Sequence, residues 1–240
     1  MTRIEKGIEI NEEHMYHVLN DIPEEVSFTD QILALGYQSL EEFFEEKAVK
    51  EMQDILKGTE ISSHMMDFLF NLSIYLKKRN PGIISIYTDE TCVCHGNNAE
   101  KVLNEDYCIE HNIPIYPYDS FGGNIVATKE DYGIAILIPT SIDVSFSLIA
   151  EKIIALLKQY YDDVQMQGND ILINGKKVIG SGVFGDQELT VMLFYFSISD
   201  KGELISAICG EPVSNKTPGY IDMIYGGEVR KELLSWLQGL

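Results

Sequence analysis

The sequence of 240 residues is poor in arginine and in basic residues generally. Its only arginines are Arg3, Arg79 and Arg230, so none lies between residues 80 and 229. Eighteen basic residues against 38 acidic ones give a formal net charge of −20 at pH 7. Phosphate backbones and anionic lipid surfaces attract lysine and arginine, so this charge argues against nucleic acid or a membrane surface as partner.

Long apolar segments and a cysteine framework are missing as well. No window holds 18 consecutive apolar residues, which argues against a membrane-spanning helix. The charged beginning, residues 1–14, argues against a secretory signal. Four cysteines are too few for a disulfide framework in a chain of this length. Together these absences predict a cytoplasmic protein.

The beginning of the chain differs from the rest in charge. Residues 1–60 hold 15 acidic and 5 basic residues, or −10 of the total −20. Apolar periodicity alternating with acidic residues predicts helices here, so we expect residues 1–80 to form an acidic helical N-terminal extension, partly packed on the core. Asn80-Pro81-Gly82 is the strongest breaker in the sequence and predicts that the main domain spans residues 81–240.

After this breaker, short strand-like runs alternate with helical ones. Residues 133–139 are almost continuously apolar, as expected of a central strand that is covered on both faces. Over residues 145–161 apolar side chains recur at helical spacing. Asn174-Gly175 lies between strand-like runs at 170–173 and 177–182 and predicts a tight hairpin. The expected fold class is α+β, a mixed sheet flanked by helices.

The segment from Gly168 to Gly182 is the most specific stretch of the sequence. It predicts a strand, a hairpin and a second strand that has Lys177 near its start and two glycines beyond it. Glycines within a strand often mark the close approach of a ligand, and a lysine on a rigid strand can stabilise negative charge there. From the residues alone, an ordinary surface hairpin with solvated lysines remains an open alternative.

This segment resembles a family motif. Asn169-Asp170, Gly175-Lys176-Lys177-Val178 and Gly180-Ser181-Gly182 are similar to the Asn-Asp … Gly-(Arg/Lys)-Lys-(Ile/Val)-x-Gly-Ser motif of lipoate–protein ligases, of which biotin–protein ligases carry a related version. Upstream segments follow the family's order of blocks: 91–98, 104–112, 113–115, 120–123 and 133–139. The resemblance covers residues 83–222 and identifies a divergent member of the lipoate/biotin protein ligase superfamily, with a class II ligase-like fold.

The resemblance also implies an activity and a set of site residues. Such ligases use ATP and Mg²⁺ to join lipoate or octanoate to AMP, and then pass the acyl group to a lysine of a carrier (lipoyl) domain. Lys177 would be the catalytic residue, holding the carboxylate and phosphate oxygens, and no protein-bound metal is expected. The implied substrate-binding residues are Gly96, Ser120, Gly122, Gly123, Asn124, Asn169, Asp170, Gly180, Ser181 and Gly182. Many lipoate ligases have an accessory C-terminal domain, for which a separate chain would have to stand in here.

The sequence departs from the family pattern in its glycine-rich loop. The family's Arg-Arg-x-Ser-Gly-Gly-Gly is replaced by Tyr-Pro-Tyr-Asp-Ser-Phe-Gly-Gly-Asn at 116–124. Both arginines are missing, and Lys129 would supply a point charge rather than a bidentate phosphate clamp.

Two other interpretations therefore stay open. One is the superfamily branch that transfers acyl groups without ATP through a cysteine thioester. Residues 165–167 and 186–191, where its nucleophile would lie, hold no cysteine, and Cys209 lies further downstream. The other is a non-catalytic or repurposed member that binds a ligand or a protein through its acidic extension.

Cys92-x-Cys94-His95 is a further candidate for chemistry. Three soft ligands in four residues suggest a metal, but structural zinc takes four ligands and the sequence offers no matching second pair. A buried strand, on which Cys92 and Cys94 share one face, is the expected structure.

Overall fold

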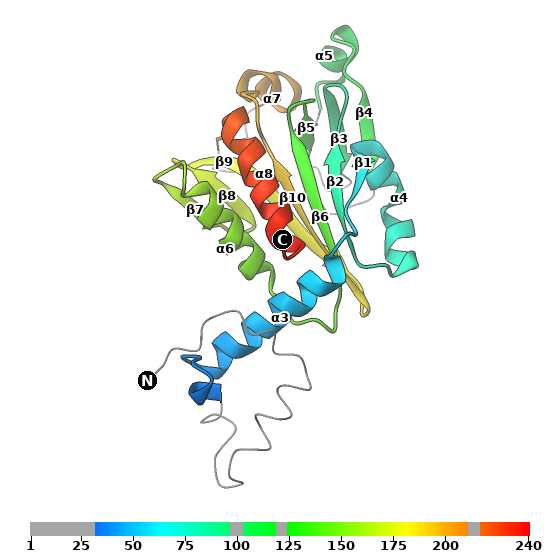
Figure 1. Cartoon of the computed structure of the whole chain (residues 1–240). Helices are drawn as coiled ribbons and strands as arrows, with labels where there is room; N and C mark the ends of the chain where they lie inside the picture. Colours follow the sequence, from blue (N-terminus) through cyan, green and yellow to red (C-terminus); the bar gives the residue numbers. More distant parts are fainter. Residues whose placement is uncertain (1–31, 97–102, 119–123, 211–216) are drawn as a thin grey trace. The chain divides into compact units, whose positions relative to one another are not determined.

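The computed structural model describes residues 32–96, 103–118, 124–210 and 217–240 (Figure 1). The chain divides into two compact units, residues 1–51 and 52–240. The sequence predicted a boundary after residue 80. Residues 61–64, which precede that position, form an edge strand of the main sheet through their pairing with β2.

The described helices and strands are, in chain order, α3 (Leu40–Leu56), β1 (Ile61–His64), α4 (Met65–Lys78), β2 (Gly82–Tyr87), β3 (Cys92–Gly96), α5 (Glu105–Glu110), β4 (Ile115–Tyr118), β5 (Ile125–Ala127), β6 (Tyr132–Pro139), α6 (Phe146–Leu157), β7 (Val164–Gln167), β8 (Asp170–Ile173), β9 (Lys176–Gly185), β10 (Leu189–Phe196), α7 (Gly202–Cys209) and α8 (Met223–Leu237). Helix α3 crosses the boundary between the units; the other elements lie in the second unit. No helix in the described ranges has the length and hydropathy needed to cross a bilayer.

Two sheets form the second unit. The larger has the strand order β1-β2-β6-β10-β9-β8-β7, in which β1 and β2 are parallel and the other neighbours antiparallel. The smaller has the order β4-β3-β5, with β3 parallel to β4 and antiparallel to β5. Strand β6, the continuous apolar run, is buried along nearly its whole length, as its sequence predicts.

Helices α6 and α8 cover one face of the large sheet (Figure 1). Phe194 of β10 stacks on Phe146 of α6 with ring centroids 5.2 Å apart. Phe196 stacks on Tyr132 at 4.4 Å, and the Tyr132 hydroxyl donates to the Gly226 carbonyl in α8 at 3.0 Å. Aromatic side chains of both β6 and β10 therefore pack the two helices against the sheet.

The opposite face of the large sheet packs against the small sheet and α4. Tyr195 lies between Phe194 and Phe196 on β10, so its side chain points to this other face. There it joins a buried apolar cluster with Cys92 and Cys94 of β3. The same cluster contains Met65, Phe68, Ile84, Ile86, Ala127, Ala135, Leu137, Leu189 and Val191.

Most of the expected strands and helices are present, and three elements were not anticipated. Two of these elements, strands β1 and β7, lie at the two edges of the large sheet and bury few apolar side chains. In each of them a single residue is buried, so their sequences carry little periodicity. Helix α7 begins without a side-chain cap at Lys201, which removes the usual signal for a helix start. The family block at 104–112 contains the short helix α5, residues 105–110.

Candidate functional site

The Asn174-Gly175 hairpin forms as its sequence predicts. Both residues have positive φ, 50° and 72°, which is the conformation that a two-residue type I′ turn requires. The turn connects β8 to β9 and brings the start of β9 next to the end of β8. Lys177 is thereby held on an ordered strand rather than on a loop.

One register shift in this hairpin decides where the Lys177 side chain points. Asp170 pairs with Gly180, but two residues further along β8, Leu172 pairs with Lys177. In a regular ladder Leu172 would face Val178, and Lys177 would point to the opposite side of the sheet. The bulge therefore turns Lys177 to the face that carries Asp170 and Gly180. Gly180 also pairs with Tyr195, so this is the face that packs against the small sheet.

The Lys177 side chain lies across Gly180 toward Asp170. Its Nζ is 3.0 Å from Asp170 Oδ1, and the two side chains are 41% and 18% exposed. A Cβ at Gly180 would lie 3.2 Å from Lys177 Cε and 3.3 Å from Nζ. At Gly182, in contrast, a Cβ would meet no heavy atom within 4 Å. The absence of a side chain at Gly180 therefore leaves room for the Lys177 side chain. At Gly182 the corresponding space holds no protein atom.

Backbone hydrogen bonds fix Lys177 at both of its polar groups. Its N–H donates to the Thr217 carbonyl at 2.9 Å, and its own carbonyl accepts from the Gly219 N–H at 2.8 Å. Nearby, the Ser181 hydroxyl donates to the Asn169 carbonyl and connects the two ends of the motif. With its main chain held in this way, Lys177 can move its ammonium group only by rotating its side chain.

Two further predicted residues, Gly96 and Asn124, lie in or next to the strands of the small sheet. Gly96 is buried at the end of β3, opposite Tyr118 of β4. Asn124 precedes β5: its Oδ1 lies 2.7 Å from His95 Nδ1, and its Nδ2 donates to Cys209 Sγ at 3.9 Å. Ser120, Gly122 and Gly123 lie outside the described residues. The described contacts thus unite the predicted residues in two groups, one on β8–β9 and one around Asn124.

Cys209 contacts the second group and precedes, in sequence, the residue that binds the Lys177 N–H. It ends α7 and is half-buried, with Asn124 as hydrogen-bond donor to its sulfur. Thr217, which binds the Lys177 N–H, follows only eight residues later (217 − 209). The sequence placed Cys209 away from the positions of a thioester nucleophile, and the structure places it beside the predicted loop asparagine.

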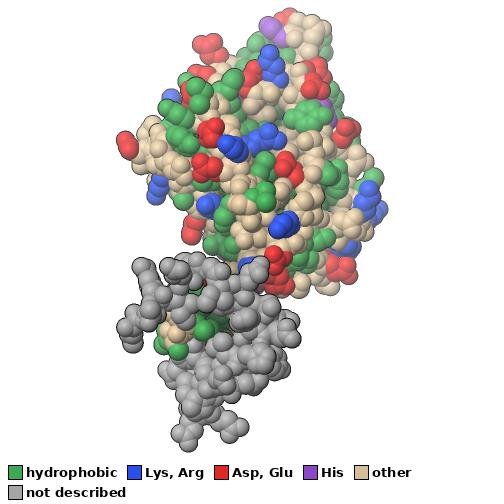
Figure 2. All heavy atoms as spheres, viewed as in Figure 1, with side chains coloured by type: hydrophobic (Ala, Val, Ile, Leu, Met, Phe, Trp, Pro, Cys, Tyr) green, Lys and Arg blue, Asp and Glu red, His purple; other side chains and the backbone are tan. Residues whose placement is uncertain are grey.

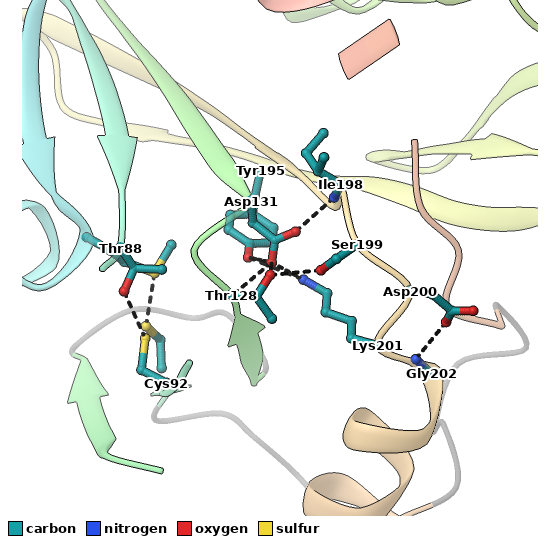
Figure 3. Close-up of polar contacts among 12 residues, drawn as sticks. Thr88, Cys92, Thr128, Asp131, Tyr195, Ile198, Ser199, Asp200, Lys201 and Gly202 are labelled. Atoms are coloured by element: carbon teal, nitrogen blue, oxygen red, sulfur yellow. Dashed lines mark hydrogen bonds and ion pairs between the residues drawn. The ribbon is translucent and has the colours of Figure 1, made fainter. Parts of the chain in front are cut away.

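A buried charged network near the site was not anticipated from the sequence (Figure 3). The Asp131 side chain is completely buried and accepts hydrogen bonds from Lys201 Nζ at 2.5 Å and from the Tyr195 hydroxyl at 2.7 Å. It also accepts from the N–H groups of Ile198 and Thr128 at 2.8 and 2.9 Å. This single carboxylate ties the β5–β6 turn to the end of β10 and the start of α7.

Burial shifts the titration of this network. Desolvation lowers the pKa of Lys201, because it outweighs the opposing effect of the Asp131 charge. Desolvation and the Asp131 carboxylate raise the pKa of Tyr195 well above its ordinary value. Tyr195 therefore stays protonated and donates to Asp131. Asp131 and Lys201 lie 70 residues apart in sequence, so no local pattern indicates their pairing.

Figure 2 shows acidic and basic side chains interspersed on the face of the second unit that carries helices α6 and α8. Lys129, the expected substitute for the family arginines, is 73% exposed and lies 3.9 Å from Glu130. Within the described ranges, no three His, Cys, Asp or Glu side chains are grouped so as to hold a metal ion.

Comparisons with known proteins match this arrangement to a family. The profile of the lipoyl protein ligase A/B catalytic domain matches residues 62–222, about two thirds of the chain. The chain belongs to this family. The match begins within β1 and ends just before α8, so it includes both sheets and the hairpin that bears Lys177. A comparison with curated protein sequences finds no match.

Solved structures of lipoate protein ligases share the fold. The T. acidophilum protein Ta0514 with bound lipoic acid superposes with a TM-score of 0.61 at 13% identity, over 77% of this chain and 87% of that one. A lipoate-protein ligase A bound with ATP gives 0.60 at 13%, over 77% and 86%. A bi-partite lipoate protein ligase from Thermoplasma acidophilum, studied with its E2 lipoyl domain, gives 0.60 at 12%, over 77% and 84%. The expected lipoate/biotin ligase-type fold is confirmed, in a divergent lipoyl protein ligase A/B domain.

Proposed function

We propose that this chain attaches a lipoyl or octanoyl group to a lysine of a carrier domain, through an acyl-adenylate. The observation that carries the proposal is the position of Lys177. The register shift in the hairpin and the room left by Gly180 bring its ammonium group to the face shared with the small sheet. Membership in the lipoyl protein ligase A/B family supports the same reaction.

In the first step, a carboxylate oxygen of the acid would attack the α-phosphorus of ATP, and the bond to pyrophosphate would break. In the second, the amine of the carrier lysine would attack the acyl carbon, and the bond to AMP would break as the amine loses a proton. Both steps place negative charge on oxygen. Lys177 would stabilise that charge after exchanging its Asp170 partner for the ligand, an effect of about 3–4 kcal/mol for one well-placed donor.

Asp170 would then be available for a second task. Mg²⁺ is commonly bound by one or two carboxylates together with the phosphates of its nucleotide. Asp170 is a partly buried carboxylate beside Lys177 and fits this role, with ATP supplying the other oxygens. The ion would neutralise phosphate charge in a site without arginine.

The partner would be a lipoyl domain in the cytoplasm. One structural relative was solved as a bi-partite ligase studied with its E2 lipoyl domain. By analogy, a separate accessory chain would complete the reaction here. Asn169, Ser181 and Gly182 on the hairpin, and Gly96 with the Ser120–Asn124 loop, would line the acyl and nucleotide sites.

Calorimetry and pyrophosphate exchange test this proposal. ATP–Mg²⁺ with lipoate or octanoate should bind, and acid-dependent exchange of labelled pyrophosphate into ATP should follow. Lys177→Ala should lower exchange by about 10²–10³-fold, and Lys176→Ala, its exposed neighbour, should retain it. If every acyl acid and nucleotide fails to bind, the enzyme proposal is wrong. The non-catalytic alternative, with residues 1–80 as a contact surface, would then stand.

A second candidate is ATP-independent transfer through Cys209, and one contact favours it. The Asn124 amide donates to Cys209 Sγ, which brings a partly exposed thiol to the predicted loop. The Cys209 thiolate would attack the carbonyl of an acyl thioester, expelling the donor thiol, which takes up the proton. The carrier amine would then attack the enzyme thioester, forming the amide and returning the proton to Cys209. This route needs no phosphate clamp, in keeping with the scarcity of arginine.

Mass spectrometry separates the two routes. Incubation with an octanoyl thioester and no ATP should add one octanoyl group to the wild type if Cys209 is the nucleophile. Cys209→Ser should prevent the addition, whereas Cys108→Ser, which changes a buried cysteine of α5, should not. Acylation that persists in Cys209→Ser, or that requires ATP, would exclude this route.

A further inference from the structure

Three sulfur atoms meet in the core between the two sheets. Cys92 and Cys94 lie on one face of β3 and are completely buried, and Met65 is 4% exposed. The Cys94 thiol donates to Met65 Sδ at 3.3 Å. Cys92 lies two residues from Cys94, on the same face of β3 and in the same apolar cluster.

Ordered elements hold all three side chains. Strand β3 is paired on both sides, with β4 and with β5, so the spacing of its two cysteines is fixed. Met65 is the first residue of α4, whose start is capped by the His64 side chain accepting from the Met66 N–H. The Thr88 hydroxyl lies 3.7 Å from Cys92 Sγ, next to the buried network (Figure 3). The sulfur cluster is therefore formed before any ligand arrives.

The geometry of β3 disfavours a disulfide between the two cysteines. Alternate residues of a strand have Cα atoms about 6.6 Å apart, near the upper limit of about 6.8 Å for a disulfide. Their Cβ bonds run parallel instead of converging. Both thiols therefore remain available as ligands.

The donor set distinguishes between metals. Zinc takes four nitrogen, oxygen or sulfur ligands, and this site has two thiols and a thioether. Thiolate and thioether sulfur are the ligands that select Cu(I). We propose that Cys92, Cys94 and Met65 form a three-sulfur binding site for Cu(I). With metal–sulfur distances of about 2.3 Å, a trigonal site has sulfur atoms about 4 Å apart, so the Cys94–Met65 pair would open slightly on binding.

Competition with bicinchoninate, a coloured Cu(I) chelator, tests the proposal on the reduced full-length protein under anaerobic conditions. The wild type should withdraw one equivalent of Cu(I), and X-ray absorption should show three sulfur neighbours. Loss of a group that only orients a metal ligand typically weakens binding by about 10–100-fold. Cys92→Ser and Cys94→Ser should each weaken binding by more than this. Cys108→Ser, which changes a cysteine of a different apolar cluster, should bind as the wild type does.

Met65→Leu keeps the proposal testable if a cysteine variant fails to fold, because leucine and methionine have similar volumes and usually exchange at low cost. It should bind Cu(I) about tenfold more weakly or worse, with two sulfur neighbours. No withdrawal of Cu(I) by the wild type would overturn the proposal. So would unchanged affinity in both Cys92→Ser and Met65→Leu. The measurement involves no acyl transfer, so its outcome is independent of the proposed function.

Discussion

Lys177 Nζ lies 3.0 Å from Asp170 Oδ1, and a one-residue shift in the β8–β9 ladder makes this contact geometrically possible. An ion pair between partly exposed side chains contributes about 0–1 kcal/mol to stability, so the pair adds little to the fold. What the shift changes is direction: it moves the lysine from one face of the sheet to the other. The hairpin thus contains one irregular position in its ladder, and because of it the lysine points to the face shared with the small sheet.

Replacement of Lys177 by alanine should separate activity from stability. Acyl transfer should fall by about 10²–10³-fold, because one preorganised charged donor is lost. The free energy of unfolding should change by less than about 1 kcal/mol, since the side chain is 41% exposed. Steady-state transfer to a lipoyl domain and urea unfolding measure the two effects. Lys176→Ala is the control, and equal losses of activity in both variants would contradict the assignment.

Replacing each of the two glycines of the motif, Gly180 and Gly182, by alanine should have different effects. A methyl group at Gly180 would lie 3.2 Å from Lys177 Cε, so Gly180→Ala should displace the lysine. Transfer should then fall by about tenfold or more, as expected when a catalytic group is misplaced. In Gly182→Ala the added methyl group meets no protein atom within 4 Å, so the variant should be as stable as the wild type and should keep Lys177 in place. Kinetics and thermal unfolding of this matched pair give the answer. A larger loss at Gly182 would show that its space is occupied by substrate.

The hairpin could be predicted from the sequence because its signals are local. Asn174-Gly175 determines the turn, and the contacts of Lys177 with Asp170 and Gly180 follow within a dozen residues. The family motif implied that Lys177 acts at the site, which stays a prediction; the register shift that sets the direction of its side chain has no separate signal in the sequence.

Long-range features of the site could not be predicted in this way. The Asp131–Lys201 pair and the Asn124–Cys209 contact connect residues 70 and 85 positions apart. Neither pair belongs to a periodic pattern. The residue type alone does not reveal whether a lysine is buried or solvated. The edge strand β1 is a related case, because its polar sequence gives no sign that it pairs with β2.

The buried network should dominate the stability of the second unit. Asp131→Asn or Lys201→Met alone should cost about 3–5 kcal/mol, since each leaves one side of a buried ion pair without its partner. The double variant should cost less than the sum of the two, because neither charge remains. Urea unfolding followed by the fluorescence of Trp236, the single tryptophan, measures all three. Lys129→Met alters a neighbouring lysine whose side chain is 73% exposed and should cost under about 0.5 kcal/mol. Additive losses at Asp131 and Lys201 would show that the two charges are not coupled.

Salt should accelerate transfer to an acidic carrier domain. The chain carries a net charge of −20, so it meets a carrier of the same sign against repulsion. Raising the ionic strength from about 0.01 M to 0.15 M shortens the screening length from about 30 Å to about 8 Å, and kcat/KM for the carrier should rise severalfold. Saturating ATP and lipoate keep the other substrates out of the comparison. A carrier variant with its acidic side chains changed to amides should be faster at low salt and nearly insensitive to salt. A rate that falls as salt is added would instead mean that the carrier binds by charge attraction, through basic residues that the acidic surface leaves accessible.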